Sequence, residues 1–232
     1  MCGRFTLTST PEALALRFEL DAPPELAPRY NVAPTQDVLA IRAQAGRRSA
    51  RSADWLRWGL VPPWAKDASV GVRMINARIE SVTSRSAYRE AVTARRCLVA
   101  ADGFYEWADL GGFKQPYYAT PAGGGPIGFA GLWEQWRDPA GRTLETCTIL
   151  TADATPVLRR VHDRMPVVVD PADHAAWLDP RPGDVDSLLE RLGASKPEWR
   201  LHPVSPRVNR ADEDDASLVA PVPEPPRQEA LF

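Results

Sequence analysis

Five short strand-like segments follow one another over residues 97–151, and no other feature of the sequence constrains the fold as strongly. Glycine runs at 111–112 and 123–125 mark two of the turns between them. Many short strands with a few helices outside them indicate an α+β domain with a curled, mostly antiparallel, barrel-like sheet and peripheral helices. The five segments are Cys97 to Ala101, Phe104 to Trp107, Gln115 to Thr120, Ile127 to Trp133 and Thr146 to Thr151.

The segments outside this run predict further strands and several helices. Thr10, Pro11 and Glu12 have the order of an N-cap, a first-turn proline and a first-turn acid, and the run that follows suits a short helix. Residues 38–43 and 55–60 are typical of two strands around a polar hairpin of arginine and serine. The other expected elements are helical residues 84–95, a helical turn at 155–160, a strand at 166–169, and helices at 171–178 and 185–192.

Charge divides the chain of 232 residues unevenly. The net charge is -2, but residues 211–232 hold six acids and one base, so residues 1–210 carry a net charge of +3. The C-terminal stretch is acidic and then proline-rich, which predicts a disordered tail after a single domain of residues 1–210. The mildly basic domain suits a local phosphate-binding strip and argues against a general polyanion binder.

Cysteine spacing and apolar runs exclude several classes of protein. Cys2, Cys97 and Cys147 form an odd set without CxxC spacing, which argues against a disulfide framework or a zinc site, so we expect no metal. No basic segment followed by an apolar run starts the sequence, and no apolar run approaches ~18 residues. We therefore expect neither a signal peptide nor a membrane helix, and a cytoplasmic protein (nucleoid-associated if bacterial) with Cys2 as a free thiol.

Cysteine directly follows the initiator methionine. Aminopeptidases remove Met1 when the next side chain is small, which would leave Cys2 with a free α-amine beside its thiol. Such a 1,2-aminothiol captures an aldehyde as a Schiff base, and the thiol then closes a thiazolidine ring. The amine has a pKa near ~8, so a useful fraction is neutral at neutral pH, and the thiolate is a strong nucleophile even as a minority species. Taken alone, a cysteine at residue 2 is better explained as a merely tolerant position.

Several polar residues stand in segments that are otherwise apolar or tight. Asn76 and Arg78 face the same side if they belong to a strand. Glu106 is flanked by aromatic residues, where desolvation would raise the pKa of its carboxyl group and suit proton transfer near neutral pH. His162 precedes an acidic and a basic residue, a setting suited to acid–base chemistry or to binding a sugar hydroxyl.

Each of these residues also has a purely structural interpretation. Glu106 fits the exposed position of an alternating strand, Asn76 fits a turn cap, and His162 fits a local pair with its acidic neighbour. Arg78 and Arg164 fit ordinary surface arginines. No single position therefore predicts a function.

Seven short motifs place these residues in a fixed order. They are MCGRF (1–5), RYNVAP (29–34), RWGLVP (57–62), INARIE (75–80), ADGFYEW (101–107), HDRMP (162–166) and HPVS (202–205). Their ordered combination resembles the SRAP family, the abasic-site processing proteins once called SOS response-associated peptidases. The resemblance runs from Cys2 to about Asn209, about nine-tenths of the chain, and leaves out the acidic tail.

The resemblance implies a covalent sensor of abasic sites in single-stranded DNA. The amine of a mature Cys2 would attack C1′ of the ring-opened deoxyribose, and its thiol would close the thiazolidine. By the same resemblance, Asn76 would hold the α-amine and the sugar, Glu106 would relay protons, and His162 would hydrogen-bond and protonate the sugar oxygen. The Schiff base also implies an associated strand-cleaving lyase activity.

The same motifs imply a set of DNA-binding residues. Arg78 and Arg164 correspond to the arginines that grip phosphates in the family. Trp64 suits stacking on a flanking base, at about 1–3 kcal/mol per base, whereas core packing is the favoured interpretation of Trp58. Ala65 stands where some relatives carry a second aromatic, so any wedge at a strand junction would be weaker here. The full set is Arg4, Asn31, Trp64, Arg78 and Arg164.

This chemistry requires no metal or cofactor, because the amine captures the aldehyde and the thiol traps the product. The expected partner is single-stranded DNA containing abasic sites, bound by a monomer and without a membrane; the sequence names no replication-fork partner. Two alternatives stay open. One is an N-terminal-nucleophile cysteine hydrolase or autopeptidase, which would need an oxyanion hole that the sequence does not identify. The other is a non-catalytic single-strand-binding module in which Cys2 is incidental.

Overall fold

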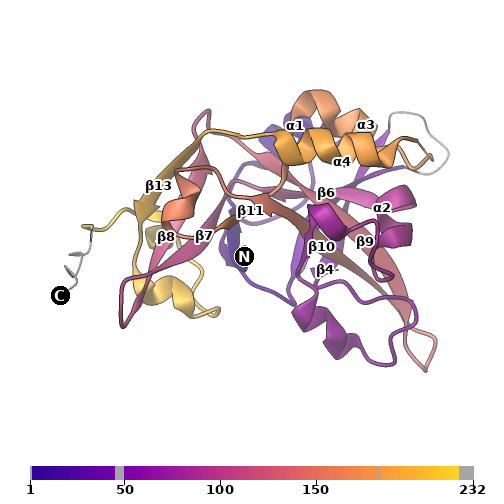
Figure 1. Cartoon of the computed structure of the whole chain (residues 1–232), viewed down its shortest axis with the longest axis horizontal. Coiled ribbons are helices and arrows are strands. Elements are labelled where there is room, and N and C mark those ends of the chain that lie inside the picture. Colours follow the sequence, from indigo (N-terminus) through magenta and orange to yellow (C-terminus); the bar gives the residue numbers. More distant parts are fainter. Residues whose placement is uncertain (1, 45–49, 182, 225–232) are drawn as a thin grey trace.

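The fold consists of two β-sheets, with the helices α1 (Pro11–Phe18), α3 (His174–Leu178) and α4 (Val185–Ala194) grouped along one side (Figure 1). The computed structural model describes residues 2–44, 50–181 and 183–224. One sheet has the strand order β13-β8-β7-β1-β2 and the other β11-β10-β4-β3-β6-β9-β12, with β5 beside β10. The strands are β1 Phe5–Leu7, β2 Arg29–Val32, β3 Asp37–Ala43, β4 Arg51–Trp58, β5 Asn76–Arg78, β6 Arg96–Ala101, β7 Gly103–Asp109, β8 Lys114–Pro121, β9 Ile127–Arg137, β10 Thr143–Asp153, β11 Arg164–Pro166, β12 Val168–Val169 and β13 Trp199–Pro203.

The helices are short and lie outside the sheets. The α-helices are α1 Pro11–Phe18, α2 Arg89–Ala94, α3 His174–Leu178 and α4 Val185–Ala194. The 3-10 helices are η1 Ala68–Arg73, η2 Ile79–Ser81, η3 Leu158–Arg160, η4 Pro171–Asp173, η5 Pro206–Asn209 and η6 Ala216–Val219. Within the described parts of the chain, no helix is both long and apolar enough to cross a membrane.

Five strands of the larger sheet close into a barrel. The long strands β9 and β10 form a hairpin. On its other side β9 pairs with β6, β6 pairs with β3, and β3 pairs with β4, and all of these pairings are antiparallel. The ring closes because β4 runs parallel to β10, with Arg57 opposite Thr146. Closure removes free sheet edges over these strands. The prediction of an α+β domain with a curled, mostly antiparallel, barrel-like core and peripheral helices is confirmed.

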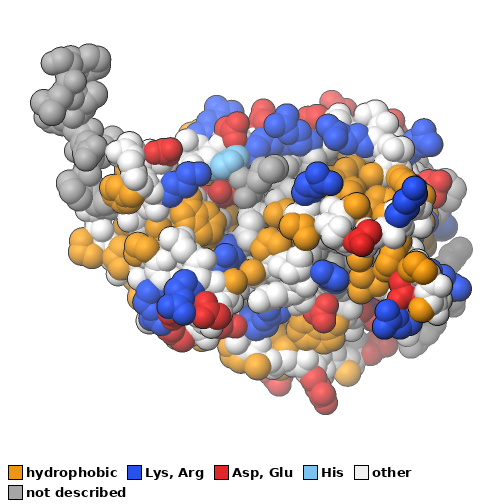
Figure 2. Space-filling model, turned by 90° about the horizontal axis from the view of Figure 1, so that it is seen from below, with side chains coloured by type: hydrophobic (Ala, Val, Ile, Leu, Met, Phe, Trp, Pro, Cys, Tyr) orange, Lys and Arg blue, Asp and Glu red, His pale blue; other side chains and the backbone are white. Residues whose placement is uncertain are grey.

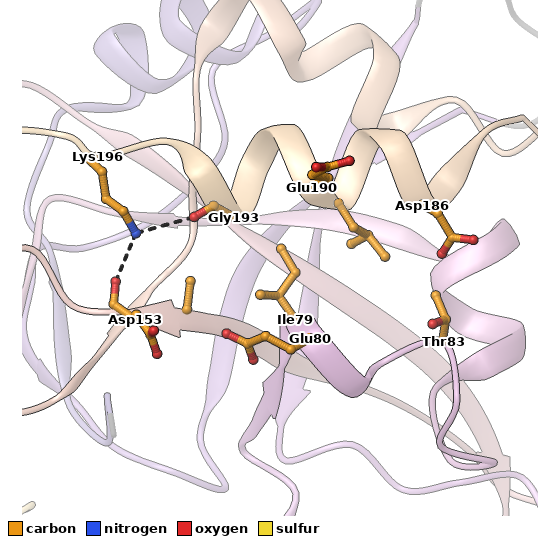
Figure 3. A pocket seen from close by; sticks show the side chains of 10 residues that line it. Ile79, Glu80, Thr83, Asp153, Asp186, Glu190, Gly193 and Lys196 are labelled. Carbon is orange, nitrogen blue, oxygen red and sulfur yellow. Dashed lines mark hydrogen bonds between the residues drawn. The ribbon is translucent and has the colours of Figure 1, made fainter.

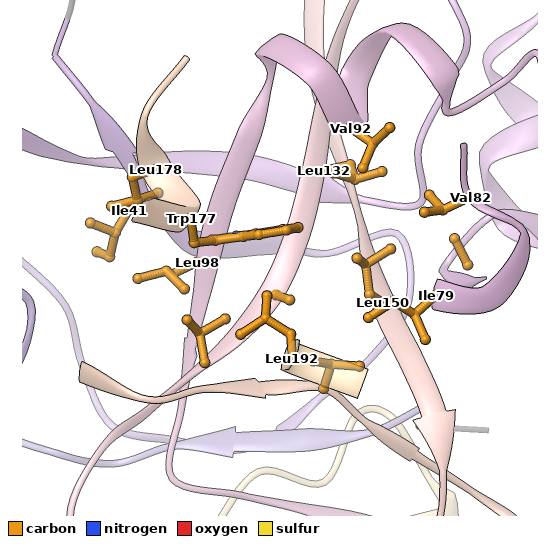
Figure 4. Packing of buried hydrophobic residues seen from close by; sticks show 14 of the residues in the cluster. Ile41, Ile79, Val82, Val92, Leu98, Leu132, Leu150, Trp177, Leu178 and Leu192 are labelled. Carbon is orange, nitrogen blue, oxygen red and sulfur yellow. The ribbon is translucent and has the colours of Figure 1, made fainter. Parts of the chain in front are cut away.

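Alternation along the strands divides the core into layers. In β6, Cys97 and Val99 face the barrel interior, whereas Leu98 and Ala100 face outward, toward the helices. Trp177 of α3 and Leu192 of α4 belong to this outer layer, and Figure 4 shows their side chains gathered with Leu98 around the barrel wall. The interior layer continues into the space between the barrel and the five-stranded sheet.

A glycine pair controls the path of the chain from β4 to β5. Gly59 has a φ of 122°, and a Cβ there would lie 2.6 Å from the carbonyl oxygen of Gly71. Beside this contact, Nε1 of Trp58 donates to the carbonyl of Ile75 at 2.9 Å. These contacts place β5, which begins at the next residue, Asn76, against the barrel.

Most elements expected from the sequence are present, and α1 begins as its residues predict, with the Thr10 side chain accepting from the Ala13 amide. The strand expected to end at Leu60 ends at Trp58, because the positive φ of Gly59 interrupts it. The hairpin turn predicted between β3 and β4 includes residues 45–49, which lie outside the described residues. The strands β1, β2, β5 and β13 were not predicted, since each is short and surrounded by polar or proline-rich sequence.

The acidic C-terminal stretch differs from the disorder predicted from Ala211 onward. Residues up to 224 lie along the outer face of the five-stranded sheet, where Leu218 is fully buried with Tyr105 and Tyr118. Their acidic side chains face solvent or accept hydrogen bonds from the protein: the Asp214 carboxylate accepts from the amide of the distant Tyr30, and Asp215 caps η6. The composition of this segment showed its acidic character but did not reveal that Leu218 packs against the five-stranded sheet. The remainder of the predicted tail, residues 225–232, lies outside the described residues.

Truncating Leu218 should therefore destabilise the protein. We expect Leu218→Ala to lower the free energy of unfolding by about 2–5 kcal/mol, the usual cost of emptying a buried leucine site. Leu16→Ala is the matched control, because the Leu16 side chain on α1 is 84% exposed and its loss should change little. Denaturant unfolding of both variants measures the difference; equal stabilities would show that the C-terminal segment contributes nothing to the fold.

Candidate functional site

Cys2 lies buried between the two sheets, at the end of the chain that Figure 1 marks N. It packs in the interior layer with Phe5 and Trp58, whose rings meet edge to face at 5.1 Å. The Cys2 carbonyl accepts a hydrogen bond from Nδ2 of Asn76 at 2.7 Å, and its Sγ lies 3.9 Å from the carbonyl oxygen of Arg4. The start of the chain is therefore held at a defined place rather than left in solvent.

Asn76 is positioned by the short strand β5. This strand runs parallel to β10, with Asn76 opposite Ile149, and the Ala77 side chain enters the outer core layer. Asn76 and Arg78 therefore share the other face, as the sequence predicted. The Oδ1 atom of Asn76 is buried and has no hydrogen-bond partner among the described residues. An amine or hydroxyl near Cys2 would satisfy this acceptor.

Glu106 is buried, with 4% of its surface exposed, on the inner face of β7. Its neighbour Tyr105 points outward and donates its hydroxyl to the carbonyl of Tyr30 at 2.7 Å. Burial raises the pKa of the Glu106 carboxyl group above its usual range, and the nearby His162 offsets part of this rise. The alternative that Glu106 is the exposed residue of an alternating strand is wrong.

The Cys2 thiol interacts with the same carboxylate. Burial, and then the charge of Glu106, raise the pKa of the Cys2 thiol far above neutrality. The sulfur is therefore a protonated thiol at neutral pH. A thiol in this state needs a base before it attacks, whereas a deprotonated amine does not.

His162 lies between η3 and β11, with its Nδ1 2.8 Å from the backbone nitrogen of Arg164 and 2.9 Å from Oδ1 of Asp163. A backbone N–H only donates, so Nδ1 accepts and a neutral imidazole carries its proton on Nε2. The Asp163 side chain is 85% exposed, so water screens its contact. The contact foreseen between His162 and its acidic neighbour is present in distance, but it is an ion pair only when the imidazole is protonated; His162 also interacts electrostatically with Glu106.

The two arginines assigned to phosphate differ in their environment. Arg164 is buried and binds the Glu80 carboxylate with two nitrogens at 2.8 Å, Asp153 at 2.6 Å and the carbonyl of Thr151 at 2.6 Å. These contacts join β11 to β10 and η2, and hold the segment that carries His162. Arg78 is exposed and has no ion-pair partner among the described residues, which leaves it available to a phosphate.

Arg4 and Asn31 connect the N-terminal strand to the C-terminal segment. Arg4 donates to Oδ1 of Asn31 and to the carbonyl of Val208, both at 2.7 Å. Asn31 is 1% exposed, and its Nδ2 donates to the carbonyls of Arg210 at 2.8 Å and Glu213 at 2.7 Å. With its side chain buried and occupied in this way, Asn31 is not available to an external ligand.

Trp64 and Trp58 have the environments expected of them. Trp64 is 59% exposed, whereas Trp58 is fully buried in the interior layer. Trp64 thus presents an aromatic face to solvent. Figure 2 shows one face of the molecule, on which basic side chains are interspersed with apolar and acidic ones, so contact with a strand would depend on local groups.

A cavity of about 380 Å³ lies beneath α4, apart from Cys2, Glu106 and His162 (Figure 3). Lys196 donates to the carbonyls of Asp153 at 3.2 Å and Gly193 at 3.4 Å at its rim. Its other charged lining residues are Glu80, Asp153, Asp186 and Glu190. This acidic surface is unsuited to a phosphate backbone. Across the described residues, no group of three or more His, Cys, Asp and Glu side chains forms a metal site.

Comparison with known proteins identifies the family. The family described as SOS response associated peptidase (SRAP) matches residues 1–211, so this chain belongs to the SRAP family. It is 38% identical over 226 residues to the abasic site processing protein YoqW of Bacillus subtilis, covering 94% of this chain and 99% of that protein. It is 33% identical to the abasic site processing protein YedK of Escherichia coli, and the match covers 96% of this chain and 100% of YedK. The resemblance read from the seven motifs is confirmed.

Relatives also include a vertebrate protein and solved structures. The chain is 32% identical to the abasic site processing protein HMCES of Gallus gallus, covering 84% of this chain and 66% of that one. A phage-related protein of Bordetella bronchiseptica has a TM-score of 0.71 at 30% identity and covers 96% of this chain and 100% of that one. A protein of Bacteroides thetaiotaomicron shares the fold at 20% identity, with a TM-score of 0.83. The match covers 95% of this chain and 100% of that protein.

The buried Glu106 should make stability depend on pH. Its raised pKa means that the folded protein binds its proton more tightly than the unfolded chain, so stability falls as pH rises from the unfolded pKa through the folded one. We expect Glu106→Gln to match the wild type below about pH 4 and to exceed it at neutral pH. Thermal unfolding across pH measures this; a difference that stays constant with pH would contradict a raised pKa at the Glu106 carboxyl group.

The two arginines should separate binding from stability. Arg78→Gln should leave the free energy of unfolding within about 0.5 kcal/mol of wild type and reduce the salt dependence of single-stranded DNA binding by about one charge. Arg164→Gln should cost about 1–3 kcal/mol, because it removes charged hydrogen bonds. Denaturant unfolding and anisotropy titrations at several salt concentrations test both; equal destabilisation would contradict the structural role of Arg164.

Proposed function

We propose that this protein processes abasic sites in single-stranded DNA by capturing the sugar aldehyde covalently through Cys2, after removal of Met1. Its membership of the SRAP family and its similarity to the abasic site processing proteins YoqW, YedK and HMCES support abasic-site processing. The observation that carries the proposal is the position of Cys2, which Asn76 holds beside the buried Glu106 and near His162. An aminothiol in this setting can react with only a few functional groups, and an aldehyde is the one that damaged DNA supplies.

The amine acts before the sulfur in this proposal. The neutral α-amine of Cys2 adds to C1′ of the open-chain deoxyribose, and loss of water gives a protonated Schiff base. The sulfur then bonds to C1′, its proton passes to a base, and the nitrogen keeps the electron pair of the former C=N bond. The high pKa of the buried thiol favours this order, because the sulfur is not an anion when the aldehyde arrives. Because the amine and the thiol belong to the same residue, Cys2, the second step is intramolecular and gains the rate advantage of a fixed orientation.

Glu106 and His162 serve as the proton carriers in the proposed reaction. A carboxyl group with a raised pKa can donate a proton to the departing hydroxyl and then accept the proton of the thiol. With its proton on Nε2, His162 can donate to the sugar ring oxygen as the ring opens. Asn76 contributes its free Oδ1 to the amine or the sugar. None of these steps requires a metal or cofactor.

The Schiff base also permits strand cleavage. While C1′ is bonded to the protonated nitrogen, removal of a C2′ proton by a base eliminates the 3′ phosphate, which is an AP lyase reaction. Closure of the thiazolidine competes with this elimination, because it consumes the C=N bond. The protein would therefore shield a site when ring closure is faster and cut the strand when it is slower.

Arg78 and Trp64 are the residues best placed to hold the strand. Both are exposed, and they provide a phosphate partner and a stacking surface respectively. We expect a monomer that acts in the cytoplasm on the single strands exposed during replication-associated repair. An N-terminal-nucleophile amide hydrolase is less favoured, because the buried, protonated thiol of Cys2 is a poor nucleophile toward an amide.

A denaturing gel tests the proposal directly. A single-stranded oligonucleotide containing one uracil is incubated with the protein, with and without uracil glycosylase. We expect a slow-migrating protein–DNA band only after glycosylase treatment, and its loss in Cys2→Ala. Cys147→Ala is the matched control, since Cys147 is buried in the barrel and should not be needed. A band that persists in Cys2→Ala, or no band with wild type, would refute covalent capture by this residue.

A further inference from the structure

The C-terminal segment brings a carboxylate to the edge of the site. Beyond the region that matches the family, Pro221 pairs with Val204 in an isolated bridge, and the Val222 amide donates to the carbonyl of Pro203 at 3.0 Å. The Glu224 carboxylate then accepts from the Tyr117 hydroxyl at 3.0 Å and lies 3.5 Å from the Arg160 guanidinium. Two donors from distant parts of the sequence thus converge on one anion.

Both donors lie next to groups of the catalytic site. Tyr117 of β8 is the direct cross-strand partner of Glu106 on β7, and side chains opposite each other in a sheet are neighbours. Tyr117 is 6% exposed, so its hydroxyl is held in place by packing. Arg160 ends η3, two residues before His162. An anion between Tyr117 and Arg160 therefore lies beside a sugar captured at Cys2.

The chemistry of this pair suits a phosphate oxygen. A phenolic hydroxyl and a guanidinium both donate, and each binds a phosphate oxygen as readily as a carboxylate. Glu224 is replaceable, because its side chain is 54% exposed, that of Arg160 is 52% exposed, and exposed ion pairs contribute little. A DNA strand has a phosphate on each side of every sugar and can offer one to this pair of donors. Glu224 belongs to the same chain as the donors, so its carboxylate is always close to them.

We propose that Tyr117 and Arg160 form a subsite for a DNA phosphate next to the captured sugar, and that Glu224 occupies it in the free protein as an intramolecular competitor. The inference rests on the proposed function for its substrate. It adds two strand-binding residues that none of the seven motifs contains, and it assigns a role to residues beyond the family match. Removing the charge of Glu224 should then expose the subsite and strengthen binding.

Binding of an undamaged single-stranded oligonucleotide tests this without the covalent step. We expect full-length Glu224→Gln to bind about two- to fivefold more tightly at low salt, with a salt dependence steeper by about one charge. The gain should disappear when Arg160→Gln or Tyr117→Phe is combined with Glu224→Gln. Glu198→Gln is the matched control: Glu198 is exposed, and its change alters net charge equally without touching the subsite.

The outcomes separate this inference from the proposed function. If Glu224→Gln and Glu198→Gln bind alike, or if the gain survives loss of Arg160, the subsite is refuted even when wild type still crosslinks to abasic DNA. If Glu224→Gln binds DNA more tightly and this increase in affinity depends on Arg160 and Tyr117, the subsite is supported. If at the same time neither the wild type nor any variant crosslinks to abasic DNA, covalent capture is refuted. Thermal unfolding of each variant confirms that the comparison involves folded protein.

Discussion

Burial of Cys2 between the barrel and the five-stranded sheet is the constraint on which the site depends. The strand β1 is three residues long, yet it pairs on both sides, with Phe5 opposite Phe104 of β7 and Val32 of β2. Pairing on both sides fixes the direction in which Cys2 enters the interior. The hydrogen bond from Asn76 then fixes the carbonyl of Cys2, so backbone pairing and one side-chain amide together orient Cys2.

The same burial controls the electrostatics of the site. Desolvation raises the pKa of both the Cys2 thiol and the Glu106 carboxyl group, and the charge of Glu106 further disfavours the ionised form of the Cys2 thiol. Such a pair costs stability, which proteins tolerate where chemistry requires it. Arg164 has a structural role, because its contacts to Glu80 and Asp153 hold the segment that carries His162. The position of His162 thus depends on an arginine whose own side chain is occupied by internal ion pairs.

Local sequence predicted the strands of the barrel because their side chains alternate and their turns contain glycine. It predicted α1 from Thr10 and Pro11, and the core position of Trp58. It failed for β1, β2, β5 and β13, since strands of three to five residues are stabilised by neighbours distant in sequence. It failed for residues 211–224 because charge dominates their composition, whereas the few apolar contacts, led by Leu218, decide their position.

The sequence by itself determined the chemical groups: an aminothiol after loss of Met1, an amide at Asn76, a carboxylate at Glu106 and an imidazole at His162, in an order that identifies the family. The tertiary structure alone decided which of them meet and in what state. Glu106 is buried, Arg164 is committed to internal ion pairs, Asn31 lies beneath the surface, and Tyr117 and Arg160 converge on Glu224. The reason is physical: burial and partners arise from strand pairing across the whole chain, and these set proton affinity and availability.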